Sequence, residues 1–138
     1  MVSLQQLNFL LQIVIFVLIS VSMYSLKKNR DFSLHGRLML GAVVLNFISF
    51  LFVMGPSIFG LRQFIIEKPT NILAISTIVH AGFGTIAEVF GISIVFPWLI
   101  KPLTKNCVKK KGIMRLTVIV WLIALFSGFL EYVILYIY

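Results

Sequence analysis

The chain has 138 residues, of which 60% are hydrophobic and 12% are charged, with a formal net charge of +8 and a mean hydropathy of +1.07. This composition excludes an ordinary water-soluble domain, in which about a quarter of the residues are charged. Four apolar runs are separated by short hydrophilic gaps, and each is long enough to cross a hydrocarbon layer about 30 Å thick as a helix. The alternating pattern of a β-barrel is absent. We therefore predict an all-α membrane protein, a single domain built as a bundle of four transmembrane helices.

The predicted spans, in chain order, are residues 7–26, 38–59, 72–100 and 113–138. The first is interpreted as a retained helix, because no Lys or Arg precedes it and no small-residue cleavage pattern follows it. Asp31 or Ser33 is the expected N-cap of the second helix, since either oxygen can accept from a free N–H of the first turn. Gly55 and Pro56 are expected to kink or stop that helix.

The twelve cations are divided unequally among the loops. Four lie in residues 27–37 and six in residues 101–115, whereas only Arg62 and Lys68 lie between the second and third spans. By the positive-inside rule, both basic loops face the cytoplasm and both termini lie on the outer side of the cell membrane. We expect the basic loops to contact anionic membrane lipids rather than nucleic acid. Cys107, in the second basic loop, has no partner cysteine and is expected to be a free thiol.

Polar side chains inside the apolar runs share helix faces with small residues when positions are set about 100° apart. We expect these faces to turn inward, because small residues let helices approach closely and polar groups avoid lipid. The faces comprise Asn8, Gln12, Ile15, Ile19 and Ser22 in the first span, His35, Ala42, Asn46 and Ser49 in the second, His80, Gly84, Ala87 and Gly91 in the third, and Ala124, Ser127, Gly128 and Glu131 in the fourth.

Glu88 and Glu131 are the most informative of these polar positions. An acidic group near the bilayer centre costs about 2.5 to 3.5 kcal/mol on insertion scales, so a partner must offset that cost. We predict a polar cluster inside the bundle that joins both carboxyl groups to His80. Gln12 and Asn46 are the other two members of this predicted cluster. The polar residues assigned to helix packing are Gln12, Asn46 and Ser127.

Two interpretations of this cluster remain open. Imidazole and carboxylate groups would suit a metal, haem or proton site, with His80 and His35 as cofactor ligands and His80, Glu88 and Glu131 as metal ligands. Alternatively, the hydrogen bonds only fix the helix register. His35 and His80 are expected to lie roughly 20 Å apart along the membrane normal, which disfavours one haem held by both. A single-histidine haem, a copper site or a site shared with a partner is compatible with the sequence.

No nucleophile constellation, Gly-rich phosphate loop or CxxC motif occurs, so the sequence does not predict an enzyme. The stretch LHGRLM at residues 34–39 contains a His-x-Arg-x-Met pattern after a basic turn, and IVHAGFG at residues 78–84 contains the histidine of the third span. The closing helix begins KGIMRLT at residues 111–117 and continues with Val120-Trp121, Ser127-Gly128, Tyr132 and Leu135-Tyr136.

These stretches, from about residue 27 to the C-terminus, resemble the CtaM/YozB-like family of small four-helix membrane proteins, a domain of unknown function linked to cytochrome oxidase assembly. The resemblance implies a helper in oxidase maturation at the stage of haem or copper loading. It also places His35 and His80 at the positions of the family's histidines.

We therefore expect an integral membrane accessory or assembly factor for a haem-copper respiratory oxidase or a similar membrane redox complex. Such a factor would bind other integral membrane subunits and hold haem or metal at His80. The alternative is a constitutive small structural subunit of a large membrane complex, in which the polar stripes serve only helix packing. A minor b-type cytochrome is a third interpretation, disfavoured because a dihaem relay needs four axial ligands and the chain has two histidines.

Overall fold

The computed structural model describes residues 4–101 and 108–136, and the predicted free thiol of Cys107 lies outside them. The described residues form helices in the order α1 (Leu4–Asn29), α2 (Phe32–Ser49), η1 (Phe50–Met54), α3 (Gly55–Glu67), α4 (Ile72–Ile100) and α6 (Lys111–Tyr136). Because α2, η1 and α3 follow one another without a break, the described residues form four long helical segments. All four are long and apolar enough to cross a membrane, as the predicted fold class requires.

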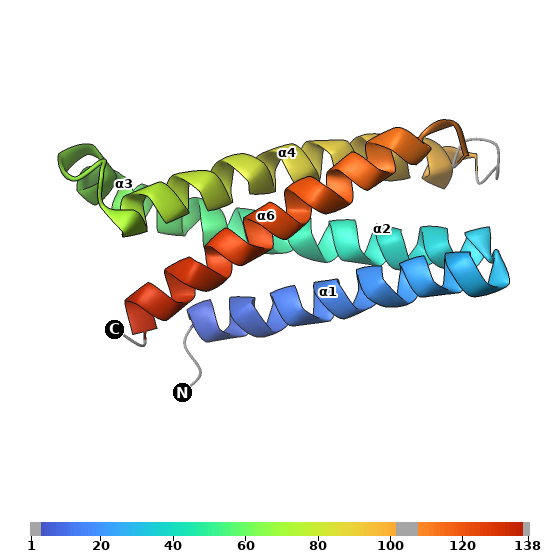
Figure 1. Cartoon of the computed structure of the whole chain (residues 1–138), viewed down its shortest axis with the longest axis horizontal. Helices are drawn as coiled ribbons and strands as arrows, with labels where there is room; N and C mark the ends of the chain where they lie inside the picture. The colour runs from blue at the N-terminus through green and yellow to red at the C-terminus, as the bar shows by residue number, and fades with distance from the viewer. Residues whose placement is uncertain (1–3, 102–107, 137–138) are drawn as a thin grey trace.

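The four segments are arranged as two hairpins (Figure 1). α1 packs mainly on α2, α6 packs mainly on α4, and the two hairpins meet where α2 lies against α4. The turn between α1 and α2 lies at the same end of the bundle as the start of α6, and α1 begins at the opposite end, where α6 finishes. The two basic stretches of the described chain therefore lie at one end, which we call the basic end, and the other is the terminal end.

Aromatic rings bridge α1 and α6, whose backbones are not closely packed. The rings of Phe9 and Tyr132 are stacked with centroids 4.8 Å apart, and those of Phe16 and Trp121 with centroids 6.1 Å apart. Large rings can span a wider separation between helices than aliphatic side chains can, and stacked pairs add attraction of their own. The bundle thus closes along this seam through side chains.

Side-chain caps fix where two helices begin. Oδ1 of Asp31 accepts from the N–H of Leu34 at 2.9 Å, so Asp31 is the N-cap of α2 and the helix starts at Phe32. Oδ1 of Asn71 accepts from the N–H of Leu73 at 2.9 Å at the start of α4. These bonds satisfy N–H groups that have no partner within the first turn.

The predicted end of the second span at residue 59 falls inside a longer helical segment, which runs from Phe32 to Glu67. Pro56 has no N–H to continue the ordinary ladder, but the chain responds by widening into the π-helical turn η1 instead of stopping. The N–H of Gly55 bonds to the carbonyl oxygen of Phe50, five residues back. The 36-residue segment is therefore longer than a bilayer requires, and α3 extends past the other helices at the terminal end.

α4 also passes through a proline without ending. Pro97 removes the N–H that would bond to the carbonyl of Ser93, one helical turn earlier. Nζ of Lys110, just before α6, donates to that carbonyl oxygen at 2.5 Å. The lysine thus satisfies the acceptor that the proline leaves free, and it ties the start of α6 to α4.

The hydrophobic core lies in the middle of the bundle, where all four segments contribute. Its buried members are Ile15, Ala42, Ala87, Val120 and Trp121. The faces predicted to turn inward are partly buried. Their buried members are Gln12, Ile15 and Ser22 on α1, His35, Ala42, Asn46 and Ser49 on α2, Ala87 and Gly91 on α4, and Ala124 on α6. Half-buried are Asn8, Ile19, His80, Gly84, Ser127, Gly128 and Glu131.

Candidate functional site

A hydrogen-bonded polar network crosses the middle of the bundle and joins three helices. Nε2 of Gln12 on α1 lies 3.4 Å from both Oδ1 of Asn46 and Oγ of Ser49 on α2. The hydroxyl of Ser49 donates to Oδ1 of Asn8, and Nδ2 of Asn46 donates to Oε2 of Glu88 on α4 at 2.6 Å. The network, defined as Asn8, Gln12, Asn46, Ser49 and Glu88, fixes the register of these helices through paired donors and acceptors.

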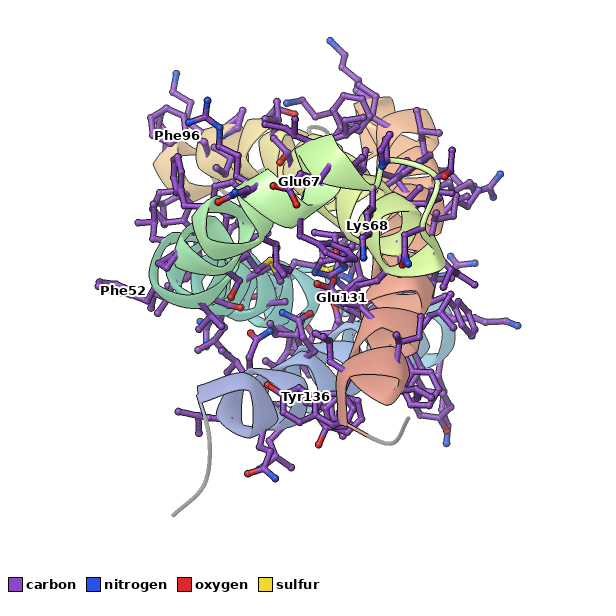
Figure 2. The ribbon with its side chains drawn as sticks, turned by 90° about the vertical axis from the view of Figure 1, so that its left-hand side faces the viewer. Phe52, Glu67, Lys68, Phe96, Glu131 and Tyr136 are labelled. Atoms are coloured by element: carbon purple, nitrogen blue, oxygen red, sulfur yellow. The ribbon has the colours of Figure 1, made fainter. Side chains whose placement is uncertain are left out.

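A large cavity lies at the terminal end of the bundle, and we call it the terminal cavity. Its volume is about 740 Å³, within the size range of small-molecule and cofactor pockets. Polar lining comes from Asn8, Gln12, Ser57, Thr77, His80 and Glu131, and much of the remaining wall is aromatic. Seen along the bundle from this end, Glu131 lies near the centre of the ring of helices (Figure 2).

His80 lines the terminal cavity with its ring fixed in one orientation. Its Nδ1 lies 2.7 Å from the carbonyl oxygen of Ala124 on α6. A carbonyl oxygen can only accept, so Nδ1 carries a hydrogen, and the neutral form of the ring has its lone pair on Nε2. The ring lies against Gly128, where an added Cβ would come within 2.6 Å of Cε1. The small residue on α6 is therefore what lets the imidazole approach the backbone.

Glu131 and Ser127, on the same face of α6, bond to α4. The hydroxyl of Thr77 donates to Oε1 of Glu131 at 3.0 Å, and the hydroxyl of Ser76 donates to the carbonyl oxygen of Ser127 at 2.7 Å. The side chain of Ser127 bonds within its own helix, to the carbonyl oxygens of Ile123 and Ala124. Ser127 thus contributes to helix packing through its backbone.

His35 lies at the basic end and is 3% exposed. Its Nδ1 lies 2.7 Å from Oγ of Ser22 and 3.3 Å from the carbonyl oxygen of Ser22 on α1, while the Ser22 hydroxyl reaches the carbonyl oxygen of His35 at 3.2 Å. All three contacts are satisfied when Nδ1 of His35 donates to the two oxygen atoms of Ser22 and the Ser22 hydroxyl donates to the carbonyl oxygen of His35. His35 therefore joins the start of α2 to α1.

The five predicted cluster residues occupy two regions of the bundle. Gln12, Asn46 and Glu88 belong to the polar network, whereas His80 and Glu131 face the terminal cavity, with Gln12 reaching both. Within the described residues, no three His, Cys, Asp or Glu side chains are close enough to hold a metal ion. The predicted ligands His80, Glu88 and Glu131 are thus not brought together as one set. His35 lines a different pocket from His80, and the two imidazoles do not share a site.

Three residues of this arrangement were not predicted as site residues. Thr77 holds Glu131, Ala124 supplies the carbonyl for His80, and Gly128 leaves room for the ring. Thr77 lies three residues before His80, so helical spacing places both on one face of α4 and is a signal that the sequence contains. The roles of Ala124 and Gly128 depend on how closely α6 approaches α4, which no local pattern contains.

The fold and the site define the class of molecule as a helical bundle whose four long segments could each cross a membrane, with a polar network beside its hydrophobic core and a ligand-sized cavity. No protein-family model, curated protein or solved structure matches the chain.

Proposed function

We propose that the protein is a multi-pass membrane accessory factor that binds a haem-copper oxidase or a similar membrane redox complex. Four apolar helical segments support insertion into a membrane. The partner class comes from the sequence resemblance described above. The proposed role is one of binding a partner and a redox group.

In this proposal the basic end faces the cytoplasm and both chain termini face outward across the cell membrane. Ten of the twelve cations in the sequence fall in the two basic stretches, and the fold brings the described parts of those stretches to one end of the bundle. Positive residues are retained on the cytoplasmic side during insertion. The basic end would then also contact anionic lipid headgroups.

The observation that carries the proposal is the state of His80 in the terminal cavity. Its Nδ1 donates to a backbone carbonyl, which is the arrangement that orients metal-binding histidines and leaves Nε2 free to bind. A haem needs only one protein ligand on its iron and a pocket of several hundred Å³, and the terminal cavity with His80 in its wall supports this proposal. Haem or copper at Nε2 would be the redox group handled for the partner complex. Of the two, haem fits better, because no three-ligand metal group is present among the described residues.

The alternative, a constitutive structural subunit, has one specific observation in its favour. The polar network already satisfies most of its own donors and acceptors and links α1, α2 and α4 without any ligand. A self-satisfied network of this kind is expected in a bundle that uses its polar residues only for helix packing. It would not need a cavity of about 740 Å³ beside an oriented imidazole.

The test is an absorbance spectrum and metal analysis of protein purified from membranes in mild detergent. We expect a haem band in the wild type that is lost in His80→Ala and kept in His35→Ala, the matched change at the other histidine. Colourless, metal-free wild-type protein that does not take up added haemin would contradict the haem part of the proposal.

The partner part is tested separately by gentle affinity purification. An accessory factor should associate with immature oxidase and leave the mature complex. Recovery at a fixed ratio with a mature complex would favour the structural subunit instead.

A further inference from the structure

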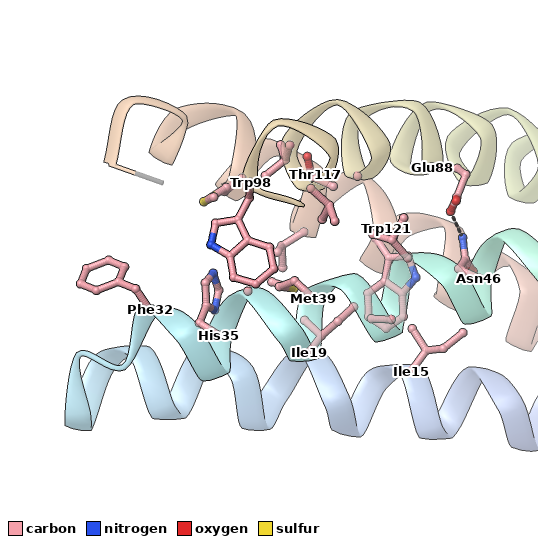
Figure 3. Close-up of a pocket in the computed structure, with 18 residues that line it drawn as sticks. Ile15, Ile19, Phe32, His35, Met39, Asn46, Glu88, Trp98, Thr117 and Trp121 are labelled. Carbon is pink, nitrogen blue, oxygen red and sulfur yellow. Dashed lines mark hydrogen bonds between the residues drawn. The ribbon is translucent and has the colours of Figure 1, made fainter. Parts of the chain in front are cut away.

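A second, smaller cavity lies between the polar network and the basic end, and we call it the basic-end pocket. All four helices of the two hairpins, α1, α2, α4 and α6, contribute to its wall. Figure 3 shows the Glu88 and Asn46 pair toward one end and Phe32, His35 and Trp98 toward the other. The pocket contains neither His80 nor Glu131, so its chemistry is independent of the function proposed above.

Glu88 brings an unsatisfied acceptor to this pocket. The residue is 5% exposed and its Oε2 accepts from Asn46, but its Oε1 is buried without any hydrogen-bond partner. Leaving a buried polar atom unpaired is costly, and native proteins rarely do so without a ligand, ion or water in place. No donor from the described chain reaches Oε1, so this acceptor is available to a donor that the protein itself does not supply.

The remaining wall restricts what that molecule can be. Apart from Glu88, Asn46, His35 and Thr117, the lining is aliphatic, aromatic, methionine or glycine. The volume is about 90 Å³, smaller than the roughly 150 Å³ of an engineered cavity that binds benzene. A small molecule with an apolar surface fits this space, whereas a strongly charged ligand or one with several polar groups does not.

We propose that the basic-end pocket binds a small apolar molecule that has a single hydrogen-bond donor, a hydroxyl or an amine, and that this donor contacts Oε1 of Glu88. The apolar body lies against Trp98, Trp121 and Met39. The ring of Trp98 is held over the backbone of α2, since a Cβ on Gly36 would come within 2.3 Å of its Cε2. This contact makes Trp98 a fixed wall of the pocket.

The two tryptophans of the chain both line the pocket, so intrinsic fluorescence reports on its occupancy. The probes are 3-bromopropan-1-ol and its isomer 2-bromoethyl methyl ether, which have the same atoms and a bromine that quenches indole on contact. Only the alcohol has a donor. In wild-type protein in lipid nanodiscs, we expect saturable quenching by the alcohol at a concentration about tenfold lower than by the ether, the effect of one hydrogen bond to a carboxylate. Equal quenching by the two isomers would overturn the proposal and would leave only water in the pocket.

Glu88→Gln tests the acceptor without changing the shape of the side chain. Because Gln12 donates to Oδ1 of Asn46, Nδ2 of Asn46 stays directed at position 88 and takes the new carbonyl. The new amide NH₂ then faces the pocket, and the advantage of the alcohol should fall to about twofold or less. A preserved tenfold advantage in this variant would contradict the assignment to Glu88.

Thr117→Val is the matched control, since it removes the one hydroxyl group among the lining residues. That hydroxyl already donates to the carbonyl oxygen of Ile113. The preference for the alcohol should be unchanged in this variant. Its loss would assign the ligand to Thr117 and overturn the proposal.

Discussion

The two ends of the bundle use the same kinds of side chain for different purposes. At the terminal end, His80 and Glu131 face a cavity of about 740 Å³, and their partners on the facing helix orient them without filling the space. Toward the basic end, the helices leave a pocket of about 90 Å³, and Glu88 in its wall has one oxygen without a hydrogen-bond partner. In the middle, the polar groups mostly satisfy one another. Polar residues inside such a bundle therefore hold helices together where they are paired and form candidate binding sites where they are not.

The largest expected effect concerns which side of the membrane each end faces. Cys107 is the single cysteine of the chain and lies in the basic stretch 101–115. With that stretch in the cytoplasm, a membrane-impermeant maleimide should label the protein in inverted vesicles and not in intact cells. Labelling in intact cells would mean that the basic end faces outward and that the terminal cavity lies on the cytoplasmic side.

Asn46→Ala is expected to cause the largest loss of stability, because Asn46 is the centre of the polar network. Its removal leaves Oε2 of Glu88 and Nε2 of Gln12 buried with fewer partners, a loss of about 3 kcal/mol in the free energy of unfolding. Denaturant titration in detergent measures it. Ser20→Ala, at an exposed hydroxyl that bonds within α1, is the control and should change stability by less than about 0.5 kcal/mol. Equal effects of the two changes would mean that the network does not stabilise the bundle.

Gly36→Ala and Gly128→Ala each perturb one end of the bundle, because the added methyl group would crowd one aromatic ring. A Cβ at Gly36 would meet Trp98 and a Cβ at Gly128 would meet His80, so each change should cost about 1 to 3 kcal/mol. Only Gly36→Ala should shift tryptophan emission. Gly41→Ala is the control, since nothing lies within 4 Å of that Cβ, and it should be neutral or stabilising by about 0.5 to 1 kcal/mol. If neither Gly36→Ala nor Gly128→Ala lowered the stability, the rings of Trp98 and His80 would not be packed tightly against these glycines.

The smallest effect is expected in the turn between α1 and α2. Arg30 has a φ of 52°, in the left-handed region that an L side chain adopts at a cost. Arg30→Gly should raise stability by up to about 1 kcal/mol in a thermal melt, while both cavities keep their properties. A clear loss of stability would show that the arginine side chain has a role beyond its conformation.

The sequence contained enough information for the four helices, the buried faces and the Asp31 cap. Helical spacing alone places Gln12 and Asn46 on inward faces. The sequence could not show that the chain would pass Pro56, because the π-helical turn that accommodates the proline is a cooperative response of several residues. Nor could it show that Lys110 would satisfy the carbonyl freed by Pro97.

The division of the predicted cluster into two groups has a related reason. Whether His80 meets Glu88 or the backbone of Ala124 is decided by distances between helices, set by small residues such as Gly128. The unpaired Oε1 of Glu88 likewise becomes visible only once all four helices are in place. Periodicity identifies the inward face, and packing decides which inward groups find a partner.

The most direct test of the central claim is ¹⁵N NMR of histidine-labelled protein in nanodiscs, where two ring systems give two sets of signals. The structure predicts hydrogen on Nδ1 of His80 and a bare Nε2, and the Nε2 signal should move on addition of haemin while that of His35 stays unchanged. Hydrogen on Nε2 of His80 with a bare Nδ1 would contradict the account, because the carbonyl of Ala124 could not then bond to the ring.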